Sequence, residues 1–384
     1  MLRIVFVTNS LACGGAENHA VTLMNRLVEL GHDCHAVRVK RESTLIGRLR
    51  LRRGATICDL GATRYLDFGA IRRLAELIAS LCPVLIVAAN PYALLYASLA
   101  RALTRVRTPL VAVLHSSRPR EPRERLKLLL ERPCFWFAAC TVFVCREQMR
   151  YWLPRAVRSR RNNVIYNGID THEFRPGACA QRRASIRARF GLERSDYVIG
   201  VVAGLRREKN HVQLIEAVRQ LRERGIAARA LLIGEGEMRP AIEARARELG
   251  VSAHVVLAGF QDDIRPLVTA CDVTALCSLT EAMPLAALES MALARPVVHS
   301  DVGGAAEIIL PGVNGFLFPP GDTAALVDRL ERLADRELAA RMSRNARKVV
   351  AKGFSESEMV ERYERLFLTL AYAPRSRGAL GEHA

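Results

Sequence analysis

Two basic residues in the second half of the chain have the types and spacing that suit binding of a phosphorylated ligand. Arg206 and Lys209 follow an apolar run that is typical of a strand, and they precede a helical pattern. At the carboxyl end of a strand, guanidinium and ammonium groups can bind diphosphate oxygens. Lys209 is notable because only five of the 57 basic residues are lysines. The competing interpretation of the pair is a solvated basic turn.

Two glutamates, eight residues apart, flank a second candidate anion site. Glu281 lies in a loop, and Glu289 lies about 6 to 8 Å further along the predicted helix at 1.5 Å per residue. Pro284, Leu285 and Ala286 begin that helix, and its free amides and positive dipole favour an anion. A sugar nucleotide has the same order of groups: sugar hydroxyls, diphosphate, ribose hydroxyls. Taken singly, each glutamate could equally be an ordinary surface or capping acid.

Glycine loops follow two other predicted strands of this half. Gly234 and Gly236 would let the backbone approach a planar base or a ribose closely, although a lone G-x-G is also found in plain turns. Gly303-Gly304 and Glu307 follow a strand predicted at residues 296–299. They would line the same end of the sheet, or they serve only as an ordinary strand-to-helix loop.

In the first half, Gly14-Gly15-Ala16-Glu17 joins the first predicted strand to its helix. Glycine amides at a helix start can approach a phosphate or sugar oxygen. The loop is neither the dinucleotide fingerprint nor a P-loop, which argues against NAD and ATP. His115 follows a strand at residues 110–114 and could face the same cleft, although a lone histidine is more often structural.

Short apolar runs alternate with amphipathic helical patterns, which predicts an α/β protein with two Rossmann-like, doubly wound parallel sheets facing a cleft. At 384 residues the chain suits two domains. We expect an N-terminal domain over 1–170, a C-terminal domain over 171–354, a last helix over 355–372 and a disordered tail over 373–384. The expected strands are at residues 2–8, 34–39, 84–89, 110–114, 141–144, 198–203, 229–233, 254–257, 273–276 and 296–299.

The net charge of +18 is concentrated in the first half. Residues 1–170 hold 27 Lys and Arg against 12 Asp and Glu, a net +15. Such a field attracts polyanions, which could be nucleic acid, anionic lipid or a phosphorylated substrate. Ten scattered cysteines without metal-ligand spacing indicate reduced core thiols and a cytoplasmic protein. No signal peptide is evident, and Pro83 and Asn90-Pro91 argue against a transmembrane span in the uncharged stretch at residues 79–100.

Together, these elements resemble the retaining GT-B glycosyltransferases of family 4 over nearly the whole chain. The matching pieces stand in family order: Gly14 to Glu17, Asn167-Gly168-Ile169-Asp170, Arg206 with Lys209, Glu281 with Glu289, Gly303-Gly304 and Asn314-Gly315. The resemblance implies transfer from a UDP- or GDP-sugar bound in the second domain to an acceptor held by the first. It also implies a last helix that crosses back to the first domain.

The resemblance also implies roles for single residues. Arg206 and Lys209 would hold the diphosphate, Glu281 the donor sugar and Glu289 the ribose, while Gly15 would meet the phosphate and His115 the reacting face of the sugar. No metal cofactor is expected, in agreement with the lack of a D-x-D motif. Retention would then follow a front-side displacement in which the departing phosphate helps to deprotonate the acceptor. Pro284 departs from the glycine of many relatives and offers no amide to the ligand.

Two basic, aromatic segments at residues 118–137 and 146–161 suit a peripheral position on the anionic inner face of the cytoplasmic membrane. The acceptor would then be a glycan or a polyprenyl-diphosphate-linked intermediate of polysaccharide or lipopolysaccharide synthesis. The other interpretation is a charged outer face over a normal core. Two further functions remain open: a non-catalytic polyanion binder, although no nucleic-acid motif is visible, and a GT-B epimerase or hydrolase.

Overall fold

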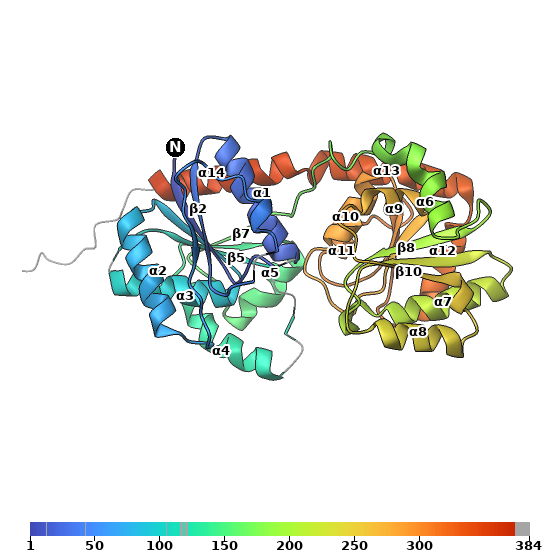
Figure 1. Ribbon diagram of the computed structural model, residues 1–384, viewed down its shortest axis with the longest axis horizontal. Helices are drawn as coiled ribbons and strands as arrows, with labels where there is room; N and C mark the ends of the chain where they lie inside the picture. Colours follow the sequence, from blue (N-terminus) through green and yellow to red (C-terminus); the bar gives the residue numbers. More distant parts are fainter. Residues whose placement is uncertain (13, 43, 105, 116–117, 120–121, 373–384) are drawn as a thin grey trace, which may run out of the picture.

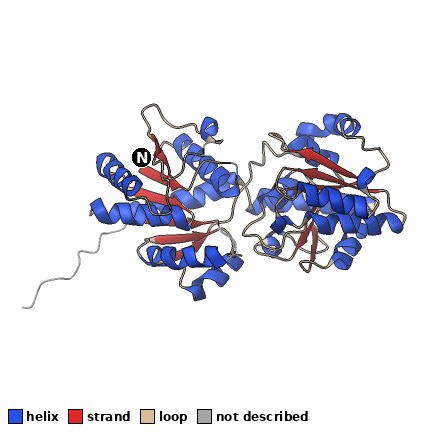
Figure 2. Ribbon diagram, turned by 60° about the horizontal axis from the view of Figure 1, so that its bottom comes forward, coloured by secondary structure: helices blue, strands red, loops and turns tan. Residues whose placement is uncertain are grey.

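The structure is a computed structural model that describes residues 1–12, 14–42, 44–104, 106–115, 118–119 and 122–372. It contains two lobes, each with a sheet covered by helices on both faces (Figures 1 and 2). Cys13 and the tail predicted over 373–384 lie outside the described residues.

The first lobe contains a seven-stranded parallel sheet with the order β3-β2-β1-β4-β5-β6-β7. Its strands are β1 (Arg3–Thr8), β2 (Asp33–Arg38), β3 (Ile57–Asp59), β4 (Leu85–Ala89), β5 (Leu110–Leu114), β6 (Cys140–Phe143) and β7 (Arg161–Val164). Its helices are α1 (Gly15–Glu29), α2 (Phe68–Leu81), α3 (Pro91–Thr104), α4 (Pro122–Trp136) and α5 (Arg146–Trp152). The central strands form because their runs of Val, Ile, Leu and Ala are apolar on both faces, as a helix-covered sheet requires.

The second lobe contains a six-stranded parallel sheet with the order β10-β9-β8-β11-β12-β13. Its strands are β8 (Tyr197–Val202), β9 (Ala228–Ile233), β10 (Val255–Gly259), β11 (Val273–Leu276), β12 (Val297–Ser300) and β13 (Gly315–Phe318). Its helices are α6 (Arg183–Arg189), α7 (His211–Glu223), α8 (Arg239–Glu248), α9 (Arg265–Ala270), α10 (Leu285–Ala292), α11 (Ala305–Ile308), α12 (Thr323–Arg332) and α13 (Arg336–Gly353). The prediction of two doubly wound α/β domains is therefore confirmed.

The last helix, α14 (Glu356–Tyr372), packs on the first lobe although the helix before it belongs to the second (Figure 1). Met359, Tyr363 and Phe367 are buried in one cluster with residues of β1, β4 and β5. The two chain segments between the lobes run side by side. The amide of Ile169 donates to Phe354 O at 2.9 Å, and the amide of Glu356 donates to Ile169 O at 2.9 Å.

Three short strands, β3, β7 and β13, were not expected from the sequence. β3 and β7 are the two edges of the first sheet, and β13 is an edge of the second. Edge strands are short and need no continuous apolar run, and the sequence of β7 is Arg-Asn-Asn-Val. The sequence around Asn167-Gly168 predicts a turn and a crossover into the second domain at residues 163–174, and this segment overlaps the end of β7.

Pro284 was expected as the first helical residue of α10, and this prediction was wrong by one position. In the structure it is the N-cap, with an extended ψ of 95°. Its carbonyl accepts from the amide of Ala287 at 3.1 Å, so the residue starts the helix without being in it. The amide of an N-cap residue makes no hydrogen bond within the helix. A proline, which has no amide proton, therefore costs α10 no hydrogen bond at this position.

The eight cysteines described are all free, and six of them are buried. Burial raises the pKa of Cys34, Cys140, Cys145, Cys271 and Cys277 to about 12, so these thiols are protonated and unreactive at neutral pH. None of the described helices has the length and apolar character needed to cross a bilayer.

Candidate active site

The candidate residues lie in loops at the carboxyl ends of both sheets, on either side of the points where strand order reverses. These points lie between β1 and β4 in the first sheet and between β8 and β11 in the second. Arg206 and Lys209 follow β8, Glu281 follows β11, and Gly303 follows β12, while Gly15 follows β1 across the cleft. Ligands of open α/β sheets bind at such positions.

Lys209 and Glu281, which the sequence assigned to different parts of a ligand, contact each other. Nζ of Lys209 forms an ion pair with Oε1 of Glu281, and the Oγ of Ser278 donates to the same oxygen at 2.8 Å. The Oγ of Ser300 in turn donates to Ser278 O at 2.6 Å. The side chains of the pair are only 24% and 14% exposed, so solvent screens the pair weakly. The carboxylate is therefore held in a fixed position before any ligand binds.

Gly234 and Gly236 are required by contact between two loops of the protein itself. A Cβ on Gly234 would lie 2.1 Å from Ala203 O, and one on Gly236 would lie 2.4 Å from Leu205 O. The amide of Leu205 donates to Glu235 O at 2.9 Å, which ties the loop after β8 to the loop after β9. The sequence predicted that the backbone at these glycines approaches another group closely. In the structure that group is the backbone of the loop after β8.

Two helix N-termini face each other across the cleft. A Cβ placed on Gly15, the first residue of α1, would lie 3.6 Å from Cδ1 of Leu285, the first residue of α10. Neither helix has a side-chain cap, and the amides of Gly15 and Ala16 in α1 and of Leu285 and Ala286 in α10 have no acceptor among the described residues. Both dipoles point their positive ends at the same space, which favours an anion there.

Glu289 is a mostly buried carboxyl in the middle of α10. Burial raises its pKa from 4.5 to about 7, and no charged group offsets this effect. The group is therefore partly protonated at neutral pH and can both donate and accept hydrogen bonds.

His115 lies directly after β5, at the first-domain side of the cleft. Burial lowers its pKa to about 4, so the ring is neutral at pH 7. Its ring centroid lies 4.5 Å from that of His19 of α1, and His19 meets the ring of Tyr363 of α14 at 5.4 Å. The Nε2 atoms of both histidines are buried without a hydrogen-bond partner among the described residues. His19 was missed in the sequence, although it is one helical turn after Gly15.

Glu307, noted in the sequence only as a loop acid, joins the two lobes. Its carboxylate accepts from the amides of Arg146 and Glu147 at 3.0 and 2.8 Å, at the N-terminus of α5. The hydroxyl of Tyr166 donates to it at 2.7 Å. Nearby, the Sγ of Cys145 donates to Ala282 O at 3.3 Å. These contacts place the loop of Glu281 against the first domain.

First-domain side chains also reach the site directly. Arg118, Tyr151 and Trp152 line a cavity of about 20 Å³ together with Glu281 and Gly303. This volume holds about one water molecule. The described residues contain no group of three or more His, Cys, Asp or Glu side chains arranged as metal ligands.

Glu17, at the start of α1, also faces the second domain. Burial raises the pKa of its carboxyl, while the nearby Arg206 guanidinium opposes that effect. Arg206 itself is exposed on the opposite wall. Together, the cleft offers cations and helix amides for a diphosphate, with carboxylates on either side that can accept from hydroxyl groups.

Two family profiles match the chain, one on each lobe. "Glycosyltransferase Family 4" matches residues 13–173, and "Glycosyl transferases group 1" matches residues 182–349. EpsD of Bacillus subtilis, described as a glycosyltransferase, is 36% identical over 50% of this chain and 51% of its own length. The UDP-Gal:α-D-GlcNAc-diphosphoundecaprenol α-1,3-galactosyltransferase of Escherichia coli is 27% identical over 54% of each chain. The chain thus spans about half the length of these curated relatives.

The fold is also shared by solved structures. The crystal structure of HepE from Anabaena in complex with UDP-glucose matches with a TM-score of 0.84, covering 96% of this chain and 100% of that one at 22% identity. At this identity, the match establishes the fold alone.

Proposed function

We propose that this chain, which belongs to the family 4 glycosyltransferases of the GT-B fold, transfers a sugar from a UDP- or GDP-sugar to a hydroxyl group of a glycan or lipid-linked acceptor. The donor would occupy the loops of the second domain, and the acceptor would lie against the first. The relatives include an enzyme whose name gives UDP-Gal as donor and a diphosphoundecaprenol glycan as acceptor. Another is described as acting in lipopolysaccharide core synthesis.

The observation that carries this proposal is the pair of uncapped helix N-termini that face each other at Gly15 and Leu285. The diphosphate of the donor would lie between them, with Arg206 and Lys209 beside it. Each of these groups would stabilise the negative charge that grows on the diphosphate as the glycosidic bond breaks. In other enzymes a metal ion stabilises this negative charge, whereas here cations and amides would stabilise it. We therefore expect transfer to continue in the presence of EDTA.

The two glutamates would bind the hydroxyl groups at either end of the donor. Glu281 is already oriented by Ser278 and Lys209, so its free oxygen can accept from the sugar without further ordering. Glu289 would accept from the ribose. His115, neutral at pH 7, would offer a hydrogen bond to the sugar and not a positive charge.

We further propose that transfer retains the anomeric configuration. Neither the sequence nor the described part of the structure assigns a carboxylate nucleophile, and a front-side displacement needs none. The leaving phosphate would take the acceptor proton, while the two domains hold donor and acceptor in contact.

The test is a donor screen followed by product analysis. Binding of UDP and GDP, alone and as sugar conjugates, would be measured by thermal shift, since a ligand at 100 times its Kd adds about 2.7 kcal/mol. The preferred donor is then incubated with polyprenyl-diphosphate-linked and free glycans, and NMR identifies the anomer formed. Donor consumption without acceptor would indicate a hydrolase or an epimerase. Failure of every nucleotide sugar to bind would contradict the proposal.

We also propose that α4 rests on an anionic membrane surface that carries the acceptor. Leu126, Leu129, Leu130, Trp136 and Phe137 are 54% to 66% exposed. Four cations, namely Arg123, Arg125, Lys127 and Arg132, lie among them along the same helix. An exposed apolar face flanked by Arg and Lys matches the boundary between acyl chains and anionic headgroups. Residues 120 and 121 of the predicted basic segment lie outside the described residues.

Cosedimentation with vesicles tests this second proposal. The protein should bind vesicles containing phosphatidylglycerol and not vesicles of phosphatidylcholine alone. Leu129→Glu with Leu130→Glu should abolish binding while leaving donor binding intact. Leu310→Glu, at a leucine of the second domain that is 48% exposed, is the matched control. Equal binding to both kinds of vesicle would contradict the proposal.

A further inference from the structure

A second cavity lies at the amino ends of the strands of the second sheet, away from the loops described above. Its volume is about 920 Å³, which is within the range of small-molecule sites. Tyr197 begins β8, Asp272 directly precedes β11, and Arg295 lies two residues before β12. In a parallel sheet, these positions are a full strand length from the carboxyl ends. The cavity is therefore separate from the donor cleft.

Arginines dominate the charged lining of this cavity. Five of them contribute, namely Arg183, Arg187, Arg194, Arg295 and Arg336, against the carboxylates of Asp196 and Asp272. The lining thus carries an excess of positive charge, in a domain whose overall charge is nearly balanced.

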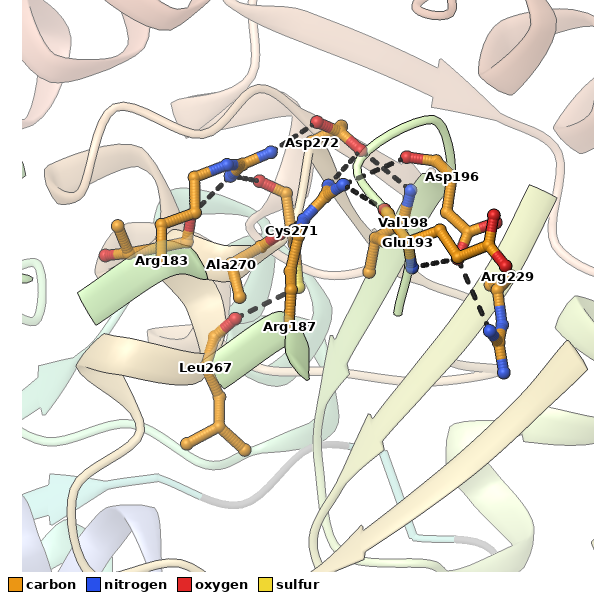
Figure 3. A network of polar contacts seen from close by, with 11 residues as sticks. Arg183, Arg187, Glu193, Asp196, Val198, Arg229, Leu267, Ala270, Cys271 and Asp272 are labelled. Carbon is orange, nitrogen blue, oxygen red and sulfur yellow. Dashed lines mark hydrogen bonds and ion pairs between the residues drawn. The ribbon is translucent and has the colours of Figure 1, made fainter. Parts of the chain in front are cut away.

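The two carboxylates are already neutralised by other contacts. Asp272 pairs with Arg183 at 2.6 Å and with Arg187 at 2.7 Å (Figure 3). Arg183 also donates to Cys271 O at 2.8 Å, so these two arginines hold α6 against the start of β11. Asp196 pairs with Arg229 at 3.3 Å. The negative charge of each carboxylate is therefore compensated by at least one guanidinium.

Arg295 is a partly buried cation of the lining that forms no ion pair among the described residues. Its side chain forms no hydrogen bond or ion pair within the part of the chain that the structure describes, and its Nε is buried without a partner. Burial lowers the pKa of its guanidinium and the neighbouring Arg183 lowers it further, while Asp272 opposes this effect. A buried polar nitrogen without an acceptor is costly, and an anionic ligand would supply one.

The rest of the lining suits the non-ionic part of a ligand. Leu192 and Leu333 are buried beneath the cavity, and Ile226 and Ala339 are partly exposed at its wall. Arg194 and Arg336 are exposed and form no ion pair among the described residues, so both are available at the entrance. An apolar wall opposite a cationic one is the arrangement of a site for an amphipathic anion.

We propose that this cavity binds a phosphorylated small molecule, with its phosphate on Arg295 and the entrance arginines and its organic part against Leu192 and Ile226. Guanidinium groups bind phosphate oxygens through two parallel hydrogen bonds, which suits a site with several arginines and no free acid. Arg183 and Arg187 would act through their ion pairs with Asp272, by keeping that carboxylate from repelling the ligand. The site is independent of the proposed transfer reaction.

Inorganic pyrophosphate is the probe, and the donor cleft must be disabled because it also suits a diphosphate. Isothermal titration of the full chain carrying Arg206→Ala and Lys209→Ala should still show one pyrophosphate site, weakened by added salt. Arg295→Met in that background should lower the affinity about tenfold or more, which corresponds to loss of a charge-assisted hydrogen bond. Because Arg295 has no acceptor to lose, the variant should melt no lower than its parent.

The matched control is Arg341→Ala, which removes an exposed arginine from α13 outside the cavity and should leave the affinity unchanged. If Arg295→Met does not fold, the proposal is tested with the double variant Arg194→Glu and Arg336→Glu. Both side chains are exposed, and the double charge reversal should abolish binding. Absence of binding at millimolar pyrophosphate in the cleft-disabled protein would overturn the proposal. Equal affinity of the cavity variants and Arg341→Ala would do the same.

Discussion

The two lobes share one topology, yet they build their sides of the cleft from different groups. The second domain presents side chains that hold one another, as Lys209, Glu281 and Ser278 do. The first presents the backbone amides at Gly15 and the neutral ring of His115, under a net charge of +15 over residues 1–170. Fixed carboxylates and cations suit one defined donor. Amides, a neutral ring and a positive field suit an acceptor that is recognised by charge and shape.

The contrast extends to the contact between the lobes. Glu307 of the second domain caps α5 of the first, and Tyr166 binds the same carboxylate. In the loop that bears Glu281, Ala282 O accepts from the Sγ of Cys145 in the first domain and from the amide of Gly304 in the second, so both domains hold this loop. If this contrast between the two domains is correct, substitutions in the second domain should remove specific transfer. Substitutions in the first domain should lower the transfer rate gradually, by an amount that depends on the salt concentration.

The largest effect is expected from Glu281→Ala. The substitution removes the proposed acceptor for the sugar and also leaves the ammonium of Lys209 without its partner in a mostly buried position. We expect the transfer rate to fall by about 10²- to 10³-fold. The measurement is product formation at saturating donor, followed by chromatography.

Glu281→Gln separates the two causes of that loss. It keeps the hydrogen bond from Ser278 but no longer pairs with Lys209 as an anion. Activity close to that of Glu281→Ala would assign the loss to charge, and activity near wild type would show that the carboxylate contributes little. The second outcome would contradict the contrast between the two domains, because donor binding by the second domain would then not depend on a fixed carboxylate.

A smaller effect is expected from Lys209→Ala. Loss of one charged hydrogen bond to the diphosphate should weaken UDP or GDP binding about 10- to 100-fold. Lys348→Ala, on α13, is the control because it removes a lysine from the same domain outside the cleft. Titration with the nucleotide alone measures the effect. Equal losses in both variants would indicate a general field effect, as we expect for the first domain and not for the second.

The sequence predicted the fold well where strands are central and apolar, and less well at edges. β4 and β5 are unbroken apolar runs, whereas β7 contains Arg161 and two asparagines, and the turn predicted at residues 163–174 overlaps its end. The short strand β13, starting at Gly315, was likewise missed. Local patterns specify buried strands, but an edge strand is defined mainly by the neighbour with which it pairs.

The site was predictable as a set of loops but not as a set of contacts. Topology alone brings Lys209 and Glu281 to neighbouring strand ends, yet their pairing joins residues 72 positions apart. The binding of Glu307 to the amide of Arg146 spans 161 positions and two domains. Propensity and spacing carry no signal for such pairs. His19 was within reach, since its spacing from Gly15 places both on one face of α1.

Gly236→Ala tests whether the loops of the second domain are rigid for structural reasons. The added Cβ would lie 2.4 Å from Leu205 O, so backbone must move, and we expect a loss of about 1 to 3 kcal/mol in the free energy of unfolding. Gly47→Ala in the first domain, where nothing lies within 4 Å of the new Cβ, should change stability little. Chemical denaturation of both variants measures the difference. Similar values would show that the loop contact is easily displaced.

The smallest effect is the pH dependence set by Glu289. Its pKa is raised from 4.5 to about 7 in the folded protein, so folding favours the protonated form. The stabilising contribution is complete below pH 4.5 and is lost as the pH rises through 7. Relative to Glu289→Gln, the wild type should lose about 1 kcal/mol between pH 5 and 8, the shift being discounted for partial exposure.

The donor should weaken this dependence. A ribose hydroxyl that donates to Glu289 favours the ionised carboxylate and lowers its pKa, so saturating UDP should flatten the stability profile of the wild type and leave that of Glu289→Gln unchanged. Denaturation at several pH values, with and without UDP, gives both curves. A wild-type profile that stays steep with UDP bound would place the ribose elsewhere. The mostly buried carboxyl would then be a feature of α10 and not of the donor site.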